Sequence, residues 1–112
     1  MAIFGYGRVS TSQQDTENQR LELEQAGWTF DFWFTDVVSG KVPAVQRKEF
    51  SEMLSKIRDG ETLVVAKLDR LGRDAIDVLQ TVRTLADRNI KVIVHQLGTT
   101  ELTSAAGKLL LS

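Results

Sequence analysis

The sequence predicts one α/β domain with a mainly parallel central sheet and helices on both faces of that sheet. Segments rich in β-branched and aromatic residues alternate with helix-forming segments in the order βαβαβαβ, and the connections are long enough for crossover helices. One apolar run is continuous, as in a strand buried on both faces. The 112 residues, 42% of them hydrophobic, suffice for a single sizeable core, so we expect one domain over 1–112.

The first half of the chain predicts two strands and one helix. Ile3–Val9 is β-prone and leads into a polar, turn-forming segment. Residues 15–26 are good helix formers that begin with an acidic residue, and Gly27 is placed to end the helix. Residues 28–38 carry aromatic and β-branched side chains before the break at Ser39-Gly40, which favours a second strand.

Two further helices are predicted from apolar side chains at helical spacing. They cover residues 47–58 and 75–88. Asp74 is placed to cap the second of them and Asn89 to end it. The apolar stripes are Phe50, Met53, Leu54 and Ile57 in the first helix, and Ile76, Leu79, Val82 (or Val78), Leu85 and Ala86 in the second.

The remaining strands are expected at 62–66, the continuous apolar run, and at 91–97, where apolar residues alternate. A loop opens at Gly98. Residues 105–111 resemble the first turns of another helix, yet the sequence reaches its last residue without a capping signal. Two interpretations stay open, a short terminal helix docked on the sheet and a helix that is truncated partway.

Composition excludes several classes of protein. There is no cysteine for a disulfide framework or a thiolate nucleophile, and the single His95 cannot supply a histidine-rich metal site. No stretch approaches the ~20 apolar residues of a membrane span, and no signal peptide is evident. We therefore expect a cytoplasmic protein with no membrane partner. The 14 Lys and Arg residues against 15 Asp and Glu also lack the basic excess of a freestanding nucleic-acid binder.

Chemistry-bearing residues follow three of the expected strands. Arg8 and Ser10 end the first, Asp36 ends the second, and residues 67–73 follow the third. Ligands of open α/β sheets bind at the carboxyl ends of strands, so these residues are expected to face one site. Guanidinium groups match phosphate oxygens bidentately and stabilise the extra charge of a pentavalent transition state, which favours attack of a hydroxyl on a phosphodiester. Asp69 or another group would assist proton transfer or orient the arginines.

Each of these features also has an ordinary structural explanation. A serine after a strand is usually a turn or cap residue, and residues 69–74 can be merely a charged loop. A hydrolase triad is disfavoured because no G-x-S-x-G motif is present. Residues 5–10 imitate a dinucleotide-binding fingerprint only in part, since the third glycine is missing.

Three strings together carry a family resemblance. They are Tyr-Gly-Arg-Val-Ser-Thr-Ser-Gln-Gln at 6–14, Asp-Val-Val-Ser-Gly at 36–40 and Leu-Val-Val-Ala-Lys-Leu-Asp-Arg-Leu-Gly-Arg at 63–73. In this order, over nearly the whole chain, the sequence resembles the serine recombinases of the resolvase/invertase family. The resemblance implies the catalytic-domain fold of that family and site-specific DNA recombination.

The resemblance also implies a role for each matching residue. Ser10 would be the nucleophile that cuts DNA and stays joined to the 5′ phosphate, which leaves a free 3′ hydroxyl for rejoining without ATP, metal or cofactor. The segment from Ser39-Gly40 to Arg47 is longer than usual in the family and contains Pro43. The implied site consists of Arg8, Arg70 and Arg73 around the scissile phosphate, Asp69 as their accompanying acid, Gln19 as an active-site glutamine, Asp36 as an acid that helps to hold the arginines, and Arg47 and Lys56 as a further basic pair.

The implied partners are a double-stranded DNA recombination site and further copies of the chain, as a homodimer and a synaptic tetramer of the full-length protein, at the nucleoid of a prokaryotic cell. In the family, the helix that begins near Gly107-Lys108 continues as a long dimerisation element, commonly followed by a DNA-binding domain. We therefore expect 1–112 to be a catalytic domain without that second domain, weak in DNA binding and recombination, and able to be monomeric. Resolution, inversion, transposition and integration all stay open.

Two other functions remain compatible with the residues. One is a phosphate- or nucleotide-binding module of the same fold that cuts nothing, and the other is a module that only pairs with intact partners. The near-neutral charge is no objection to a DNA-cutting site, because basic residues concentrate in a few places along the chain. Those expected at or near the site are Arg8, Arg47, Lys56, Lys67, Arg70 and Arg73.

Overall fold

Strands and helices alternate along the chain as expected, and the computed structural model describes residues 2–11, 13–97 and 100–101. Short 3-10 turns, η1 to η3, follow β2, β3 and β4. The elements are β1 (Ile3–Val9), α1 (Gln13–Gln25), β2 (Phe32–Val37), η1 (Ala44–Gln46), α2 (Lys48–Lys56), β3 (Thr62–Val65), η2 (Leu68–Leu71), α3 (Ala75–Asp87), β4 (Lys91–Val94), η3 (His95–Leu97) and β5 (Thr100–Glu101).

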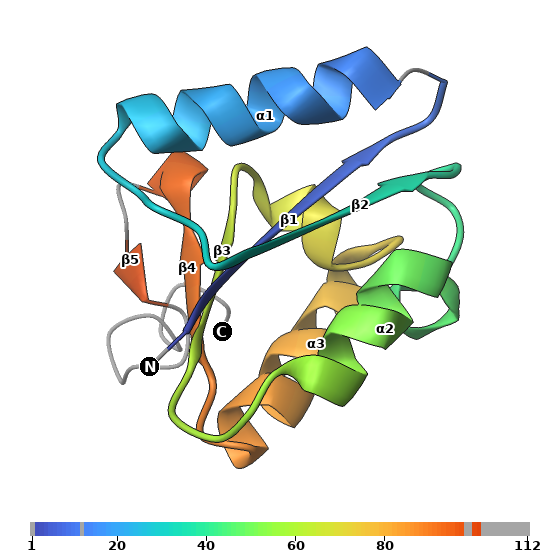
Figure 1. Cartoon of the computed structure of the whole chain (residues 1–112). Helices are drawn as coiled ribbons and strands as arrows, with labels where there is room; N and C mark the ends of the chain where they lie inside the picture. The colour runs from blue at the N-terminus through green and yellow to red at the C-terminus, as the bar shows by residue number, and fades with distance from the viewer. Residues whose placement is uncertain (1, 12, 98–99, 102–112) are drawn as a thin grey trace.

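The strands form one sheet in the order β2-β1-β3-β4-β5. The pairs β1 with β2, β1 with β3, and β3 with β4 are parallel, and β5 is antiparallel to β4. Helix α1 covers one face, whereas α2 and α3 cover the other (Figure 1). The chain leaves β1 toward β2 on one side and later returns to β3 on the other. The carboxyl ends of β1 and β3 therefore flank the crevice in which such sheets bind ligands.

Successive side chains of β1 point to opposite faces of the sheet. Phe4 and Tyr6 are buried in the core against α2 and α3. Gly5 and Gly7 face the other way, where a Cβ on Gly5 would lie only 2.3 Å from Cε3 of Trp33. The indole can therefore lie directly on β1, because neither glycine has a side chain.

The residues expected to end α1 and α3 and to cap α3 are confirmed, whereas α1 begins at residue 13 and not 15, and α2 ends at residue 56 and not 58. Gly27 ends α1 with φ of 107°, and Asn89 ends α3 with φ of 58°. The Asp74 carboxylate accepts a hydrogen bond of 2.8 Å from the Asp77 amide at the start of α3. Helix α2 differs, because its N-cap residue Arg47 makes no side-chain capping bond.

Two strand predictions extend too far. β2 begins at Phe32 and not at residue 28, because the Trp28 amide donates to the Leu23 carbonyl at 3.2 Å and so completes the end of α1. β4 ends at Val94, since the next residues turn over the end of β3, where the Gln96 amide donates to the Ala66 carbonyl at 2.9 Å.

The expected core position of Ile76 is wrong. This side chain is 70% exposed. The buried residues of α3 begin after it and are Val78, Thr81, Val82 and Leu85. Ile76 lies in the first turn, beside Asp77, whose carboxylate turns toward neighbouring loops. A short antiparallel β5 also occupies residues expected to be loop. The helix expected at 105–111 lies outside the described residues.

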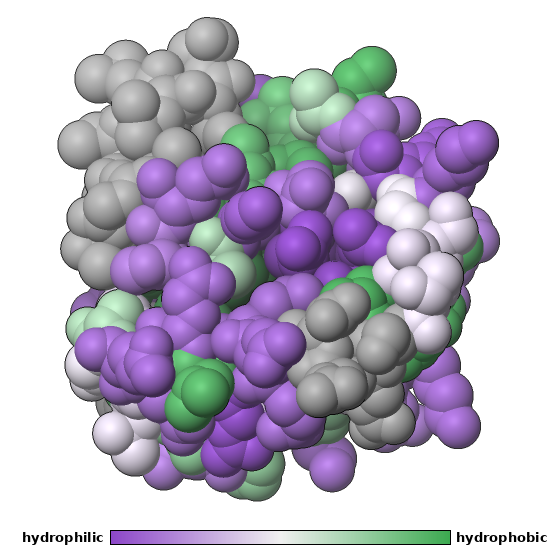
Figure 2. All heavy atoms as spheres, turned by 90° about the horizontal axis from the view of Figure 1, so that it is seen from above, coloured by the Kyte–Doolittle hydropathy of each residue, from purple (hydrophilic) through white to green (hydrophobic). Residues whose placement is uncertain are grey.

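No helix in the described part of the chain is long and apolar enough to cross a membrane. The outer face seen from above is largely hydrophilic, and strongly hydrophilic side chains gather around a hollow on it (Figure 2). Helix α1 lies on this side, and Thr16 and Leu23 are buried among the side chains described over its residues 16–25.

Candidate active site

The carboxyl ends of β1, β2 and β3 bring most of the predicted site residues to one edge of the sheet. Arg8 lies one residue before the end of β1 and pairs in register with Asp36 of β2. β3 is the other neighbour of β1, and residues 67–73 follow it directly. The three strings that the sequence singled out therefore meet in space.

Arg8 is held by backbone groups of the loop after β2. Its Nη1 donates to the Val38 carbonyl at 3.1 Å, and its guanidinium lies so close to Gly40 that a Cβ there would be 3.4 Å from Cζ. Burial lowers the pKa of Arg8, and the positive charges of Arg70 and Arg47 lower it further, while Asp69 opposes them. A bound anion would relieve this repulsion among like charges.

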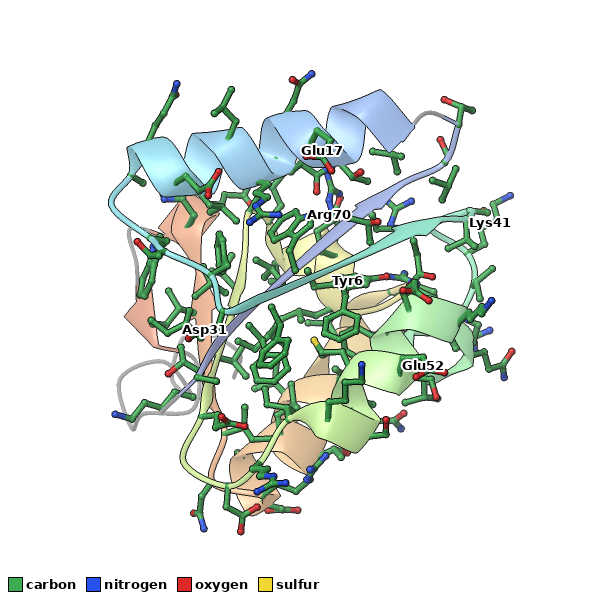
Figure 3. All side chains as sticks on the ribbon, in the orientation of Figure 1. Tyr6, Glu17, Asp31, Lys41, Glu52 and Arg70 are labelled. Carbon is green, nitrogen blue, oxygen red and sulfur yellow. The ribbon has the colours of Figure 1, made fainter. Side chains whose placement is uncertain are left out.

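Gln19 of α1 joins the first helix to this cluster. Its Nε2 donates to the Arg8 carbonyl at 3.1 Å, and its Oε1 accepts from the Arg8 amide at 3.3 Å. The same oxygen accepts from Nε of Arg70 at 3.2 Å. Arg70 lies between α1 and β1 (Figure 3) and forms an ion pair with Asp69. Gln19 and Asp69 thus set the direction of the Arg70 guanidinium.

Arg47 lies underneath the cluster, with only 1% of its surface exposed. Its Nε donates to the Val42 carbonyl at 3.1 Å and its Nη1 to the Arg70 carbonyl at 2.8 Å. Its Nη2 and the Nε of Arg8 are buried donors without a partner among the described residues. Buried donors are rarely left unpaired, so two of them at one cationic edge favour an anionic ligand.

Asp36 makes its hydrogen bonds away from this surface. Its carboxylate accepts from the Tyr6 hydroxyl at 2.8 Å and from the amides of Glu49 and Phe50 at 2.9 and 3.0 Å. It therefore caps α2 from a neighbouring strand. Burial raises the pKa of Tyr6, and the bond to Asp36 and its charge raise it further, whereas Arg47 opposes them.

Tyr6 was not among the residues expected at the site. The available signal was its spacing, because Tyr6 and Arg8 are two apart on a strand and share a face. Tyr6 points toward α2 (Figure 3). A buried phenol needs a hydrogen-bond partner, and Asp36 supplies it.

Ser10 and Arg73 lie on the outside of the cluster. Ser10 directly follows β1 and is exposed, just beyond the last bond of the strand pair, in which the Val38 amide donates to the Val9 carbonyl at 2.9 Å. Arg73 is exposed and lies 3.6 Å from Asp74 across a surface ion pair. Both side chains are accessible to a large substrate.

Lys56 is not brought to this cluster. It is the last residue of α2, and its Nζ lies 5.6 Å from the ring centre of Phe34, beside a shallow pocket that Phe4 and Phe32 help to line. Helix α2 starts at the end of β2, where Asp36 caps it, and runs back toward the start of that strand. Its last residue is therefore carried away from the arginines.

The described residues include no group of three or more His, Cys, Asp or Glu side chains placed to hold a metal ion. The positive charge of the site comes from guanidinium groups that hydrogen bonds hold in place. Such a set can bind a phosphate diester and stabilise negative charge that develops on it. Ser10, an exposed residue with a hydroxyl group, follows β1 directly and is two residues from Arg8.

Known proteins provide an independent comparison. The family described as "Resolvase, N terminal domain" matches residues 3–112. Tn2501 resolvase of Escherichia coli is 45% identical over 109 residues, which cover 96% of this chain and 56% of the resolvase. Serine recombinase PinR of Escherichia coli K12 is 40% identical over 111 residues, which cover 97% of this chain and 57% of PinR. The chain thus spans little more than half the length of these relatives.

The fold also matches solved structures. The N-terminal catalytic domain of TP901-1 integrase superposes with a TM-score of 0.77 at 29% identity, covering 97% of this chain and 88% of that domain. A resolvase-family site-specific recombinase from Streptococcus pneumoniae superposes with a TM-score of 0.71 at 24% identity, which bears on the fold alone.

Proposed function

Because the chain belongs to the resolvase family of serine recombinases, we propose that it is the catalytic domain of a site-specific DNA recombinase in which Ser10 attacks the scissile phosphate. One observation carries the proposal from the structure. Two buried guanidinium donors that find no partner in the described part of the chain, on Arg8 and Arg47, lie at the sheet edge where the exposed Ser10 follows β1.

In this mechanism the Ser10 oxygen forms a bond to phosphorus while the bond from phosphorus to the 3′ oxygen breaks. The serine proton leaves to a base, and the departing 3′ oxygen takes up a proton. The products are a 5′-phosphoserine link and a free 3′ hydroxyl. Because the phosphoester bond is exchanged and not hydrolysed, a 3′ hydroxyl of another strand can reverse the step with Ser10 as leaving group, without ATP.

The arginines provide the positive charge for this step. Arg8, Arg47 and Arg70 donate to the non-bridging phosphate oxygens, and the charge that develops in the transition state strengthens these bonds. Arg73 contacts the phosphate from the outer side of the site. Asp69 and Gln19 keep Arg70 oriented, since both already hold it in the free protein. In this proposal no metal or cofactor takes part.

The proposed partner is a double-stranded DNA recombination site, with homodimers and synaptic tetramers of the full-length protein bringing two sites together. We propose that the residues that read the DNA sequence lie outside 1–112. This agrees with the 56% of Tn2501 resolvase that the chain covers. We also propose that strand exchange takes place at the nucleoid of a prokaryotic cell.

The test is a search for protein joined to cut DNA. The full-length protein is incubated with DNA that carries the recombination site from its own locus, and the denatured products are examined for protein on 5′ ends. Ser10→Ala should abolish the link and leave DNA binding intact, because only the hydroxyl is lost. Ser55→Ala, at an exposed position of α2, is the matched control and should form the link normally.

A link that persists in Ser10→Ala contradicts the assignment of the nucleophile. Protein attached to 3′ ends contradicts the direction of attack. Binding of DNA by the wild type without any covalent link would instead favour a phosphate-binding module that does not cut.

A further inference from the structure

Asp77, in the first turn of α3, connects two loops that carry site arginines. Its Oδ2 accepts a hydrogen bond of 3.1 Å from the Ala44 amide and one of 2.8 Å from the Arg73 amide. Its own amide is held at 2.8 Å by Asp74, the N-cap of α3. One carboxylate oxygen therefore joins the turn that leads into Arg47 to the loop that follows β3.

The same two segments are joined again three residues away. The Arg47 Nη1 donates to the Arg70 carbonyl at 2.8 Å. Residues 44–47 and 70–73 are thus tied at both ends, by the Asp77 carboxylate at one end and by the Arg47 guanidinium at the other. Both ties involve an ionised group, and such hydrogen bonds are about twice as strong as neutral ones. Ala44 and Arg47 are buried, whereas the hydrogen bond from the Arg73 amide to Asp77 is exposed.

Gly72 allows the segment 70–73 to approach the start of α3. A Cβ on Gly72 would lie 2.6 Å from the Val78 amide nitrogen and 2.9 Å from the Asp77 carbonyl carbon. These are backbone atoms of α3 that cannot move aside. The loop reaches the Asp77 carboxylate because residue 72 has no side chain, and the buried Leu71 anchors the loop from the other direction.

We infer that Asp77 is a positioning residue for the recombinase reaction, one that holds the arginine-bearing segments 44–47 and 70–73 in register without touching DNA. The inference rests on the proposed function for its effect on the reaction. Without the carboxylate, the Ala44 and Arg73 amides lose their shared acceptor, and the two segments can separate. Arg70 and Arg73 would then shift relative to Arg8, and misplacement by about 1 Å can cost a hundredfold in rate.

The tie itself can be tested without any reaction. In isotope-labelled full-length protein, Asp77→Asn should shift the amide proton resonances of Ala44 and Arg73 upfield together, because a neutral carboxamide is a weaker acceptor than a carboxylate. Asp87→Asn, at the exposed last residue of the same helix, is the matched control and should leave both resonances unchanged. Movement of neither resonance, or of only one, overturns the tie.

The effect on the reaction is measured as the single-turnover rate of phosphoserine formation at saturating DNA. Asp77→Ala should lower this rate by about ten- to a hundredfold with little change in site affinity, and Asp77→Asn should recover part of it because its oxygen still accepts. Val82→Ala, a truncation at a buried core position, serves as the control for lost stability.

The comparison is made well below the melting temperatures of both variants. A loss in Asp77→Ala no larger than that in Val82→Ala would mean that Asp77 matters only for stability, and the inference fails. If the wild-type protein forms no phosphoserine link at all, the proposed function fails. The amide resonances of Asp77→Asn still test the hydrogen bonds from Ala44 and Arg73 to Asp77 separately.

Discussion

Arg47 keeps a charged group in the core of the domain, with 1% of its surface exposed. Removing a guanidinium from water costs several kcal/mol, and two carbonyl acceptors repay this only in part. A buried charge of this kind is weak evidence for stability, and in the proposed function Arg47 is a donor to the scissile phosphate. Its Nη2, which has no partner among residues 2–11, 13–97 and 100–101, is the atom that would make this contact.

Tyr6 is expected to make the domain less stable at alkaline pH. Its pKa is raised by burial and by Asp36, so the folded state keeps the phenol proton at pH values where the unfolded chain has lost it. Stability is therefore expected to fall as pH rises above about 10, the ordinary pKa of tyrosine. Unfolding free energies measured by urea should decline more steeply in the wild type than in Tyr6→Phe.

Tyrosinate absorbance gives a direct check on this expectation. Tyr6 is the single tyrosine of the chain, so the folded protein should ionise well above a short peptide, and urea should bring the transition back to the ordinary range. A folded protein that titrates like the peptide would contradict the buried bond to Asp36.

Helices α2 and α3 begin in physically different ways. The carboxylate of Asp74 caps α3 from its own N-cap position. The carboxylate of Asp36 caps α2 from β2, which precedes the helix by more than ten residues, and it also accepts from Tyr6. The first kind of cap can be predicted from neighbouring residues, whereas the second depends on how a strand and a helix pack.

The two caps should differ in what they contribute to stability. Asp74→Ala should lower the free energy of unfolding by about 1 kcal/mol, as for an ordinary N-cap. Asp36→Ala should cost roughly two to three times as much, because it leaves two helix amides and a buried phenol without their acceptor. Urea denaturation of both variants measures this difference, and equal losses would contradict the role of Asp36 as a buried cap.

At the scale of the whole molecule, the basic residues expected at the site do not all lie together. Arg8, Arg47 and Arg70 meet at the carboxyl ends of β1 and β3, whereas Lys56 lies over Phe34 toward the other end. The formal charge of −1 therefore coexists with a local cationic site. The positions of these residues along the chain did not predict that Lys56 lies apart from the arginines.

This division predicts different kinetics for two groups of variants. Arg8→Ala and Arg70→Ala should each lower the rate of phosphoserine formation by about a hundredfold or more, and far more than they lower DNA affinity. In the proposed mechanism these arginines stabilise charge that develops in the transition state. Lys56→Ala should leave the rate of this step near that of the wild type. A loss in Lys56→Ala equal to that of the arginine variants would contradict the placement of Lys56 outside the site.

The sequence by itself determined the order and type of the main helices and strands, the ends of α1 and α3, and membership of the family. These depend on local periodicity, on helix-capping residues such as Gly27, Asp74 and Asn89, and on short sequence motifs. The same strings located the edge of the sheet at which the candidate site lies.

Only the tertiary structure decided which side chains meet at that edge. It placed Arg47 under Arg70, carried Lys56 away, turned Asp36 toward Tyr6 and α2, left Ile76 exposed, and made Asp77 a common acceptor for two loops. The physical reason is that these contacts join residues far apart in sequence. Their geometry follows from the direction in which each helix crosses the sheet, and packing of the whole core sets that direction.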